Sequence, residues 1–363
     1  MTQTDSSIAT VDAPPAPAYE GHVTPRDVEQ AVTTDGRLFE FRDMEVYFPV
    51  RVGFFRAMVE TEKRFVKAVD RISFTIAPGE ILALVGESGC GKTTTGRTLL
   101  GLEKMTGGEI LYKGLPVSHF TQAALRLFRR NAQIIFQDPY NSINPKHTIY
   151  DIVAEPLLVN RMVHTEREKE EQVVKALESA GLRPARDYLY RYPHELSGGQ
   201  RQRVCIAGAT VLEPDVIVAD EPVASLDVSI RNDILKLMVQ QKEELGVTYL
   251  FITHDLSLAW VISDRIAVMY LGKIVEIGET EEVVKNPQHP YTKALISVIP
   301  VPDPTTRRER VILSGETPNP ANMPSGCRFH PRCPERMDEC SEVEPQDVHL
   351  GGTHYGACLR LGR

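Results

Sequence analysis

Hydrophobic residues in this chain gather in short, nearly continuous runs that are separated by glycine-containing or polar stretches. The runs at residues 80–85, 216–219 and 247–252 are almost wholly apolar, as strands buried on both faces are. Residues 38–42 instead alternate apolar and polar positions, which predicts an edge strand, and residues 265–278 predict a hairpin. Helix-like segments lie between these runs, so the pattern predicts an α/β fold.

The middle of the chain follows a helical period. Residues 149–158 are apolar-periodic. A second helix is predicted to begin after Thr165, which can cap it, to carry several acids in its first turn and to end near Gly181. We therefore expect a helical subdomain at residues 141–196, inserted between two halves of the α/β core.

Composition distinguishes the two ends from the middle. Residues 1–36 are rich in Ala, Pro, Thr and Asp, which predicts a disordered tail, with a docking arm as the alternative. Residues 37–280 would form the main domain, and residues 281–363 a small, cysteine-rich C-terminal extension. Residues 49–64 interrupt the strand pattern and indicate an insertion.

The overall charge and hydropathy exclude some classes of protein. The chain has 363 residues and a net charge of −8, which argues against a protein that binds nucleic acid. Its first residues lack the basic and apolar regions of a signal peptide, and no apolar run reaches the roughly 18 residues that a membrane helix needs. The sequence therefore predicts a soluble, cytosolic protein.

A glycine-rich motif directly after the first buried run predicts a phosphate site. Residues 86–93 read Gly-Glu-Ser-Gly-Cys-Gly-Lys-Thr, which is the P-loop pattern between a predicted strand and a predicted helix. Glycines let successive N–H groups point at phosphate oxygens, and the helix adds its positive end. Lys92 would reach the β- and γ-phosphates, and Thr93 would offer its hydroxyl to Mg²⁺. The predicted phosphate-binding residues are Gly86, Glu87, Ser88, Gly89, Cys90, Gly91, Lys92, Thr93 and Thr94.

Two carboxylates follow the second buried run. In P-loop NTPases an acid at this place holds Mg²⁺, and we expect Asp220 to do so, directly or through the metal's water shell. Glu221 is placed to polarise an attacking water. His254 ends another buried run and is predicted to contact the γ-phosphate. Gln137, also at the end of a predicted strand, could coordinate Mg²⁺ through its side-chain carbonyl.

A second anion site is predicted after the helical segment. Ser197, Gly198 and Gly199 stand before a helical pattern, where backbone N–H groups and a helix N-terminus can bind negative charge. A chain with two anion sites needs either two ligands or one ligand that both sites share.

Aromatic residues upstream of the P-loop could bind an adenine base by stacking. We favour Phe48 for this role, with Tyr47 second. Ordinary packing within a strand is the alternative for either residue.

Most of the cysteines lie near the C-terminus. In a cytosolic protein such a cluster indicates metal binding rather than disulfides, and four thiols match the ligand count of a [4Fe–4S] cluster. A zinc site, in which His330 or His354 could replace a thiol, and unligated thiols are the alternatives. The expected role is a structural staple for a small domain. The predicted ligands are Cys327, Cys333, Cys340 and Cys358.

Together these motifs resemble those of an ABC-type ATPase over about residues 38–280. The matching elements are the P-loop, Gln137, Leu-Ser-Gly-Gly-Gln at 196–200, Val-Ile-Val-Ala-Asp-Glu-Pro at 216–222, Ser-Leu-Asp at 225–227 and His254. The resemblance implies a P-loop NTPase (RecA-like) core with an antiparallel β subdomain and the helical subdomain. It also implies hydrolysis of ATP with Mg²⁺, in which Glu221 and His254 are catalytic and Glu221 is the general base or orients the water.

The resemblance also accounts for two anion sites in one chain. Two subunits are expected to sandwich two ATP molecules, each γ-phosphate lying between the P-loop of one chain and the Leu-Ser-Gly-Gly-Gln signature of the other. The helical subdomain would receive a coupling helix from a membrane permease, and Gln137 would link it to the γ-phosphate. The residues implied to act on the partner's ATP are Ser197, Gly198, Gly199, Gln200 and Asp227.

Segments 136–145 and 286–295 are similar to those of oligopeptide and dipeptide (also nickel) uptake ATPases, above all the F-type subunit. This implies a peripheral protein at the cytoplasmic face of the membrane that pairs with a D-type ATPase and two permease subunits, and indirectly with an extracellular substrate-binding protein. Related ATPases carry an iron–sulfur cluster at similar cysteines.

Two other classes of protein fit this sequence less well. A soluble ABC protein of translation or DNA repair usually has two cassettes or further insertions, whereas this chain has one cassette. A regulatory module without hydrolysis is disfavoured by the intact Glu221 and His254.

Overall fold

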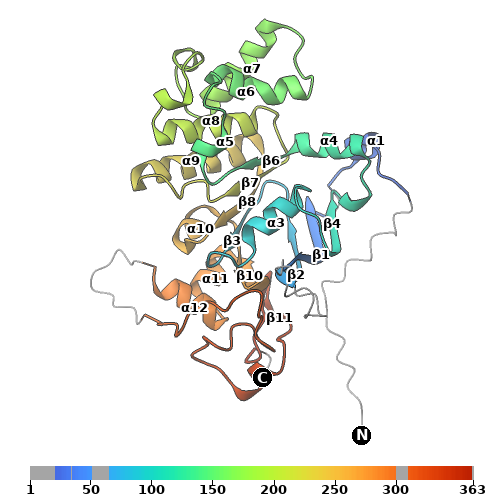
Figure 1. Ribbon diagram of the computed structural model, residues 1–363, viewed down its shortest axis with the longest axis vertical. Helices are drawn as coiled ribbons and strands as arrows, with labels where there is room; N and C mark the ends of the chain where they lie inside the picture. The colour runs from blue at the N-terminus through green and yellow to red at the C-terminus, as the bar shows by residue number, and fades with distance from the viewer. Residues whose placement is uncertain (1–20, 34, 51–64, 300–309, 362–363) are drawn as a thin grey trace, which may run out of the picture.

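The computed structural model describes residues 21–33, 35–50, 65–299 and 310–361. The described residues form two sheets, with a helical lobe at one end of the molecule and the C-terminal extension at the opposite end (Figure 1). Most of the predicted insertion at residues 49–64 lies outside the described residues.

The larger sheet is the core of the protein. Its strand order is β11-β12-β10-β9-β3-β8-β7-β6, and the neighbours from β9 to β6 are parallel, while the other pairs are antiparallel. The strands span Ile81–Val85 (β3), Ala132–Ile135 (β6), Val216–Asp220 (β7), Thr248–Thr253 (β8), Arg265–Tyr270 (β9), Lys273–Glu279 (β10), Val348–Gly351 (β11) and His354–Gly356 (β12). Because parallel strands end at the same edge, the residues after β3, β7 and β8 are brought together.

The smaller sheet is the antiparallel β subdomain. Its order is β2-β1-β4-β5, with every pair antiparallel. The strands are Phe39–Pro49 (β1), Phe65–Ile76 (β2), Gly107–Tyr112 (β4) and Leu115–Pro116 (β5). Phe39 and Phe41 are buried while Glu40 between them is partly exposed, so the predicted alternation is confirmed. The predicted position at the edge of a sheet is wrong, because β1 pairs with β2 on one side and with β4 on the other.

Helices connect and cover the sheets. They are Pro25–Gln30 (α1), Lys92–Leu99 (α3), Gln122–Asn131 (α4), Pro139–Ser142 (α5), Ile149–Val159 (α6), Glu166–Ser179 (α7), Gly198–Thr210 (α8), Val228–Leu245 (α9), Leu256–Ile262 (α10), Thr280–Lys285 (α11) and Pro290–Ser297 (α12). Short 3₁₀ helices span Val117–His119, Ala185–Asp187, Pro193–Glu195 and Asp338–Ser341. Both predicted helices of the middle segment are confirmed: Thr148 caps α6, and Thr165 caps α7. They pack on each other and on α8 at the end of the molecule farthest from the extension (Figure 1).

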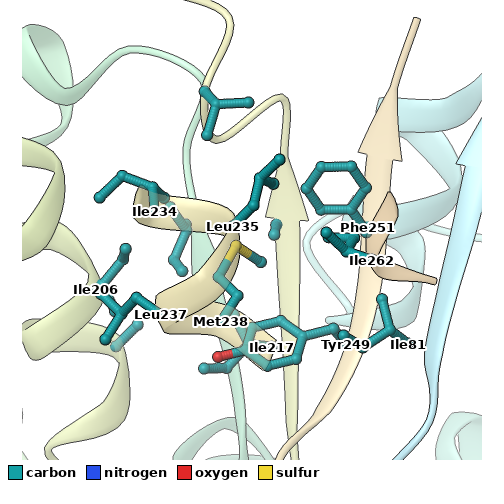
Figure 2. Packing of buried hydrophobic residues seen from close by; sticks show 14 of the residues in the cluster. Ile81, Ile206, Ile217, Ile234, Leu235, Leu237, Met238, Tyr249, Phe251 and Ile262 are labelled. Atoms are coloured by element: carbon teal, nitrogen blue, oxygen red, sulfur yellow. The ribbon is translucent and has the colours of Figure 1, made fainter. Parts of the chain in front are cut away.

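Two apolar clusters fill the space on the two faces of the larger sheet. Alternate residues of one strand belong to different clusters, as Ile217 and Val218 of β7 do. On one face, Ile217 and Tyr249 from the strands pack with Met238 of α9 (Figure 2). Each fully buried side chain of this kind contributes about 1.5–3 kcal/mol. Strands buried on both faces explain why the sequence shows continuous apolar runs here.

The sequence predicts a disordered tail at residues 1–36. Residues 1–20 lie outside the described residues, but the prediction is wrong for the residues that follow, which include helix α1. Thr24 caps α1 with a capping box, and Val23 and Val28 are buried. Val23 also forms a β-bridge with Phe120. The prediction rested on the average composition of the tail, which does not show that Val23 and Val28 are buried against the rest of the protein.

The C-terminal extension is joined to the larger sheet rather than standing apart. Strand β12 pairs with β10, so the extension adds two strands to the sheet that contains the P-loop strand β3. The Glu276 carboxylate of β10, almost fully buried, accepts hydrogen bonds from the backbone N–H groups of Gln288 and His289 and lies 2.8 Å from His354 Nε2. These contacts cross the predicted domain boundary between residues 280 and 281. The boundary therefore stays a prediction.

Candidate active site

The P-loop curls between the end of β3 and the start of α3. A Cβ on Gly86 would lie 2.1 Å from the Met269 carbonyl oxygen, and one on Gly91 would lie 2.2 Å from the Ala68 carbonyl oxygen. Gly91 also has φ 113°, a conformation that side chains rarely allow. These glycines are therefore required by close backbone contacts, and they hold the loop tightly against β9 and β2.

Lys92 lies inside the loop. Its ammonium group donates to the carbonyl oxygens of Gly86 at 2.7 Å and Glu87 at 2.9 Å, and the side chain is buried. No side chain caps the N-terminus of α3, which begins at Lys92. The free N–H groups of this first turn and the lysine fit a phosphate group.

Two of the three predicted magnesium ligands, Thr93 and Asp220, meet near the ends of β3 and β7, whereas Gln137 contacts Glu221 and its magnesium role stays a prediction. The Thr93 hydroxyl donates to Asp220 Oδ1 at 3.1 Å. Burial, followed by the neighbouring negative charge of Glu221, raises the pKa of Asp220, while the Thr93 hydrogen bond lowers it. A hydroxyl beside a buried carboxylate is a donor set that suits Mg²⁺, whose charge would favour the ionised form.

Glu221 is held by two of the other predicted residues. Gln137 Nε2 donates to Glu221 Oε2 at 3.0 Å, and His254 Nδ1 lies 3.0 Å from Glu221 Oε1. The Glu221 backbone has φ 46°, and its N–H donates to the Ile252 carbonyl oxygen. The left-handed backbone at Glu221 interrupts the extended conformation of β7, and the two side-chain contacts hold both carboxylate oxygens in place.

A small cavity lies next to this carboxylate. It has a volume of about 40 Å³, and Glu221, Thr253 and His254 contribute to its lining. This volume suits water molecules rather than a larger ligand. Glu221 is 16% exposed and His254 is 58% exposed, so the histidine lies at the outer side of the cavity.

The predicted adenine-binding residues end strand β1. The Tyr47 hydroxyl donates to Asp70, and the Lys67 ammonium lies 5.2 Å from the centre of the Tyr47 ring. Phe48 is 38% exposed. An exposed ring can accept a base on its face, whereas Tyr47 already has contacts of its own. The stacking role stays a prediction for both.

The Leu-Ser-Gly-Gly-Gln signature lies at the start of α8. Ser197 Oγ accepts from the Gln200 N–H at 3.3 Å, and Gln200 Oε1 accepts from the Ser197 N–H at 3.0 Å. A Cβ on Gly199 would lie 2.5 Å from Ile230 of α9, so this glycine permits close helix packing. Ser197 is exposed, and within the described residues no hydrogen bond joins this signature to the P-loop. Asp227, at the start of α9, is exposed and makes no capping bond.

The expected iron–sulfur site is wrong. Among the residues that the structure describes, no group of three or more His, Cys, Asp or Glu side chains is placed to hold a metal ion. Cys327, Cys333, Cys340 and Cys358 are all free, and the zinc alternative fails for the same reason. Cysteine count along a sequence does not establish ligand geometry in space.

Sequence reasoning missed one set of contacts at this site. The sequence predicts Glu87 only as a phosphate-binding residue of the P-loop, yet its side chain and its N–H contact Tyr291, Thr317 and Arg332 of the C-terminal region. None of these three belongs to a nucleotide-binding motif, so the sequence carried no signal for them.

Comparison with known proteins agrees with the class that this geometry defines. Residues 69–224 match the family model described as "ABC transporter", and residues 275–340 match "Oligopeptide/dipeptide transporter, C-terminal region". The chain belongs to the ABC transporter ATP-binding proteins and, within them, to the oligopeptide/dipeptide transport group.

Curated relatives place the chain more closely. It is 48% identical over 324 residues to the oligopeptide transport ATP-binding protein AppF of Bacillus subtilis (strain 168), covering 88% of this chain and 96% of that protein. It is 44% identical over 323 residues to the dipeptide transport ATP-binding protein DppF of Escherichia coli (strain K12), covering 89% of this chain and 94% of the relative.

Solved structures show the same cassette. CbiO1 from Clostridium perfringens, part of the ABC transporter complex cbiONQ, matches with a TM-score of 0.59 at 28% identity, over 69% of this chain and 92% of that one. The ATP-binding cassette MJ0796, solved as a dimer bound to ADP and phosphate, matches with a TM-score of 0.58 at 26% identity, over 67% of this chain and 98% of that one. In the described part of our chain, no helix is both long and apolar enough to cross a bilayer.

Proposed function

We propose that this protein is the ATP-hydrolysing subunit of an ABC importer and energises uptake of di- and oligopeptides through a separate membrane permease. One observation carries the chemistry: at one edge of the sheet, Glu221 is held by Gln137 and His254 beside a water-sized cavity. The peptide assignment is supported by the C-terminal region and by the names of the relatives.

Each side chain has a role that its contacts support. Lys92 and the N–H groups of the loop and of α3 bind the phosphates, and Thr93 with Asp220 would hold Mg²⁺. The ion, when bound, neutralises charge that builds up on the transferred phosphoryl group. Glu221 orients the attacking water or accepts its proton. His254 fixes the Glu221 carboxylate and reaches toward the γ-phosphate.

The proposed partner for catalysis is a second ATPase subunit. Ser197 and Asp227 are exposed, and among the described residues no hydrogen bond joins either of them to the P-loop, which supports binding of the partner's ATP. The dimeric MJ0796 cassette is a structural precedent for such pairing. We favour a heterodimer with a D-type ATPase, at the cytoplasmic face of the membrane.

The helical lobe carries a groove that supports contact with a permease. The groove has a volume of about 380 Å³ and is lined by residues of α5, α6 and the segment after α5, among them Ser142, Asn144 and Val159. Val159 is 75% exposed. Gln137 lies five residues before Ser142 and contacts Glu221, so a helix seated in the groove could act on the catalytic carboxylate through this short segment. An extracellular binding protein would deliver the peptide to the permease.

The proposed function is tested with Glu221→Gln in cells and in the purified transporter complex. We expect ATP turnover to fall at least about 100-fold, because the water loses its positioned base, while ATP binding is retained. Uptake of a radiolabelled tripeptide should fall to background. Glu213→Gln, at an exposed glutamate that pairs with Lys175, is the matched control and should behave as the unmodified protein.

Two outcomes would contradict parts of this proposal. Unchanged ATP turnover in the Glu221→Gln complex would refute the assignment of the catalytic carboxylate. Loss of ⁶³Ni²⁺ uptake with unchanged tripeptide uptake would show that the cargo is nickel and refute the peptide assignment.

A further inference from the structure

Glu87 of the P-loop is the meeting point of the catalytic loop and the C-terminal extension. Its Oε2 accepts from Arg332 Nη1 at 2.8 Å and from the Thr317 hydroxyl, and its N–H donates to the Tyr291 hydroxyl at 3.0 Å. Its carbonyl oxygen accepts from Lys92 Nζ at 2.9 Å. A single residue therefore connects three residues of the C-terminal region to the lysine that binds the phosphates.

The contact is charged and largely shielded from water. The Arg332 side chain is 9% exposed and the Glu87 side chain is 29% exposed. Burial alone would raise the pKa of Glu87, but hydrogen bonds from Arg332 and Thr317 outweigh it and hold this pKa below its usual value. Glu87 is therefore ionised at neutral pH. Loss of Arg332 would leave a half-buried carboxylate without its counter-ion, next to the phosphate site.

The residues around Arg332 are anchored in the core. Phe329 is 1% exposed, and its ring lies 5.2 Å from that of Tyr270 at the end of β9 and 5.4 Å from that of Tyr291 in α12. Arg332 also lies 6.0 Å from the centre of the Tyr270 ring. This packing holds the guanidinium in place, so the arginine can act as a fixed support for the loop.

The same turn of the chain reaches a second part of the nucleotide site. Arg328 Nη2 donates to Asp70, and Asp70 accepts from the hydroxyl of Tyr47. Although burial acts in the opposite direction, the Tyr47 hydrogen bond and the charge of Arg328 lower the pKa of Asp70 to about 2. Residues 328–332 thus contact the P-loop directly and reach the end of β1 through Asp70 of β2.

We propose that Arg332 is a positioning residue for ATP binding, which acts through Glu87 to hold the P-loop and Lys92 in the geometry that accepts phosphate. By this contact the C-terminal extension sets the affinity of the cassette for ATP. The inference rests on the proposed ATPase function, but it concerns the affinity for ATP and is independent of the transported solute.

A double-mutant cycle on the purified full-length chain tests the proposal. ATP affinity is measured by isothermal titration calorimetry with MgATP for Arg332→Ala, Glu87→Ala and the double variant. We expect each single change to weaken ATP binding about tenfold and the double variant also about tenfold, because both residues act through one contact. Arg332→Lys, which keeps one charge but loses the forked geometry, should recover part of the affinity.

Matched controls separate positioning from general stability. Arg360→Ala removes another ion pair of the extension, at the half-exposed Arg360 and Glu335, and should leave ATP affinity within about twofold of the unmodified chain. Thr317→Val removes only the second donor to Glu87 and should weaken ATP binding about threefold. Thermal melting without nucleotide shows whether a variant is folded.

Each remaining result has a defined meaning. Unchanged ATP affinity in folded Arg332→Ala, or effects of Arg332→Ala and Glu87→Ala that multiply to about a hundredfold, would overturn the proposal. If Arg332→Ala does not fold, unchanged affinity in both Arg332→Lys and Thr317→Val would overturn it. If the unmodified chain does not bind MgATP, the proposed ATPase function fails instead.

Discussion

The P-loop and the Leu-Ser-Gly-Gly-Gln signature are both predicted anion sites at helix N-termini, but the chain supports them differently. The P-loop is enclosed by β2, β9 and the C-terminal extension, and its lysine is buried. The signature bonds mainly to itself, through the Ser197 and Gln200 capping box, and presents Ser197 to solvent. One half of the site is therefore assembled within the chain, while in the proposed dimer the other half would act on the ATP of the partner subunit.

The largest expected effects come from disabling each half in turn. Lys92→Ala should weaken ATP binding to the isolated chain by at least about 30-fold, because a buried charge contact to the phosphates is lost. Ser197→Arg should leave ATP binding to the isolated chain within about twofold but should lower turnover of the assembled complex at least tenfold. Calorimetry and a phosphate-release assay measure the two quantities. Equal loss of ATP binding in both variants would show that the two halves serve one chain.

Acid should weaken the support of the P-loop half. His289, in the segment that leads to Tyr291, is buried, and this burial, with a smaller effect of Lys293, lowers its pKa to about 4 despite the neighbouring Glu276. Between pH 6.5 and pH 4 the unfolded chain binds a proton that the folded chain does not, so the free energy of unfolding falls as the pH falls through this window. The loss is on the order of 3 kcal/mol at pH 4.

Urea unfolding followed at pH 7.5 and at pH 5 checks this prediction. His289→Asn keeps a side-chain acceptor for the Tyr291 N–H but does not titrate, so it should reduce the dependence on pH. His164→Asn, at an exposed histidine, should retain it. An unchanged pH dependence in His289→Asn would assign the effect to other groups.

The smallest expected effects separate the two possible roles of Ser197. Ser197→Ala and Thr165→Ala each remove a helix N-cap and should each lower the free energy of unfolding by about 1 kcal/mol. Only Ser197→Ala should also lower ATP turnover of the complex, because Thr165 lies in the helical lobe and binds no anion in our proposal. Equal turnover in the two variants would leave Ser197 with a capping role alone.

Much of the cassette could be predicted because its chemistry depends on local patterns. Continuous apolar runs identified the parallel strands. Asp220 and Glu221 directly follow one such run, and the P-loop that contains Lys92 begins directly after another. The topology of a parallel sheet then brings these strand ends to one edge. Prediction failed where local composition was misleading: α1 lies in a tail rich in proline and alanine, and the cysteines near the C-terminus do not form a metal site among the described residues.

The sequence by itself determined the class of the protein and the order of its motifs, and it predicted the residues of both anion sites, because glycine spacing and strand-end acids carry that information over a few positions. Only the tertiary structure decided that Glu221 is held between Gln137 and His254, and that Arg332 reaches Glu87 from 245 positions along the chain. Such contacts depend on how β10, α12 and the C-terminal segment pack against the sheet. No local pattern encodes them, because the free energy of packing is shared among residues that are distant in sequence.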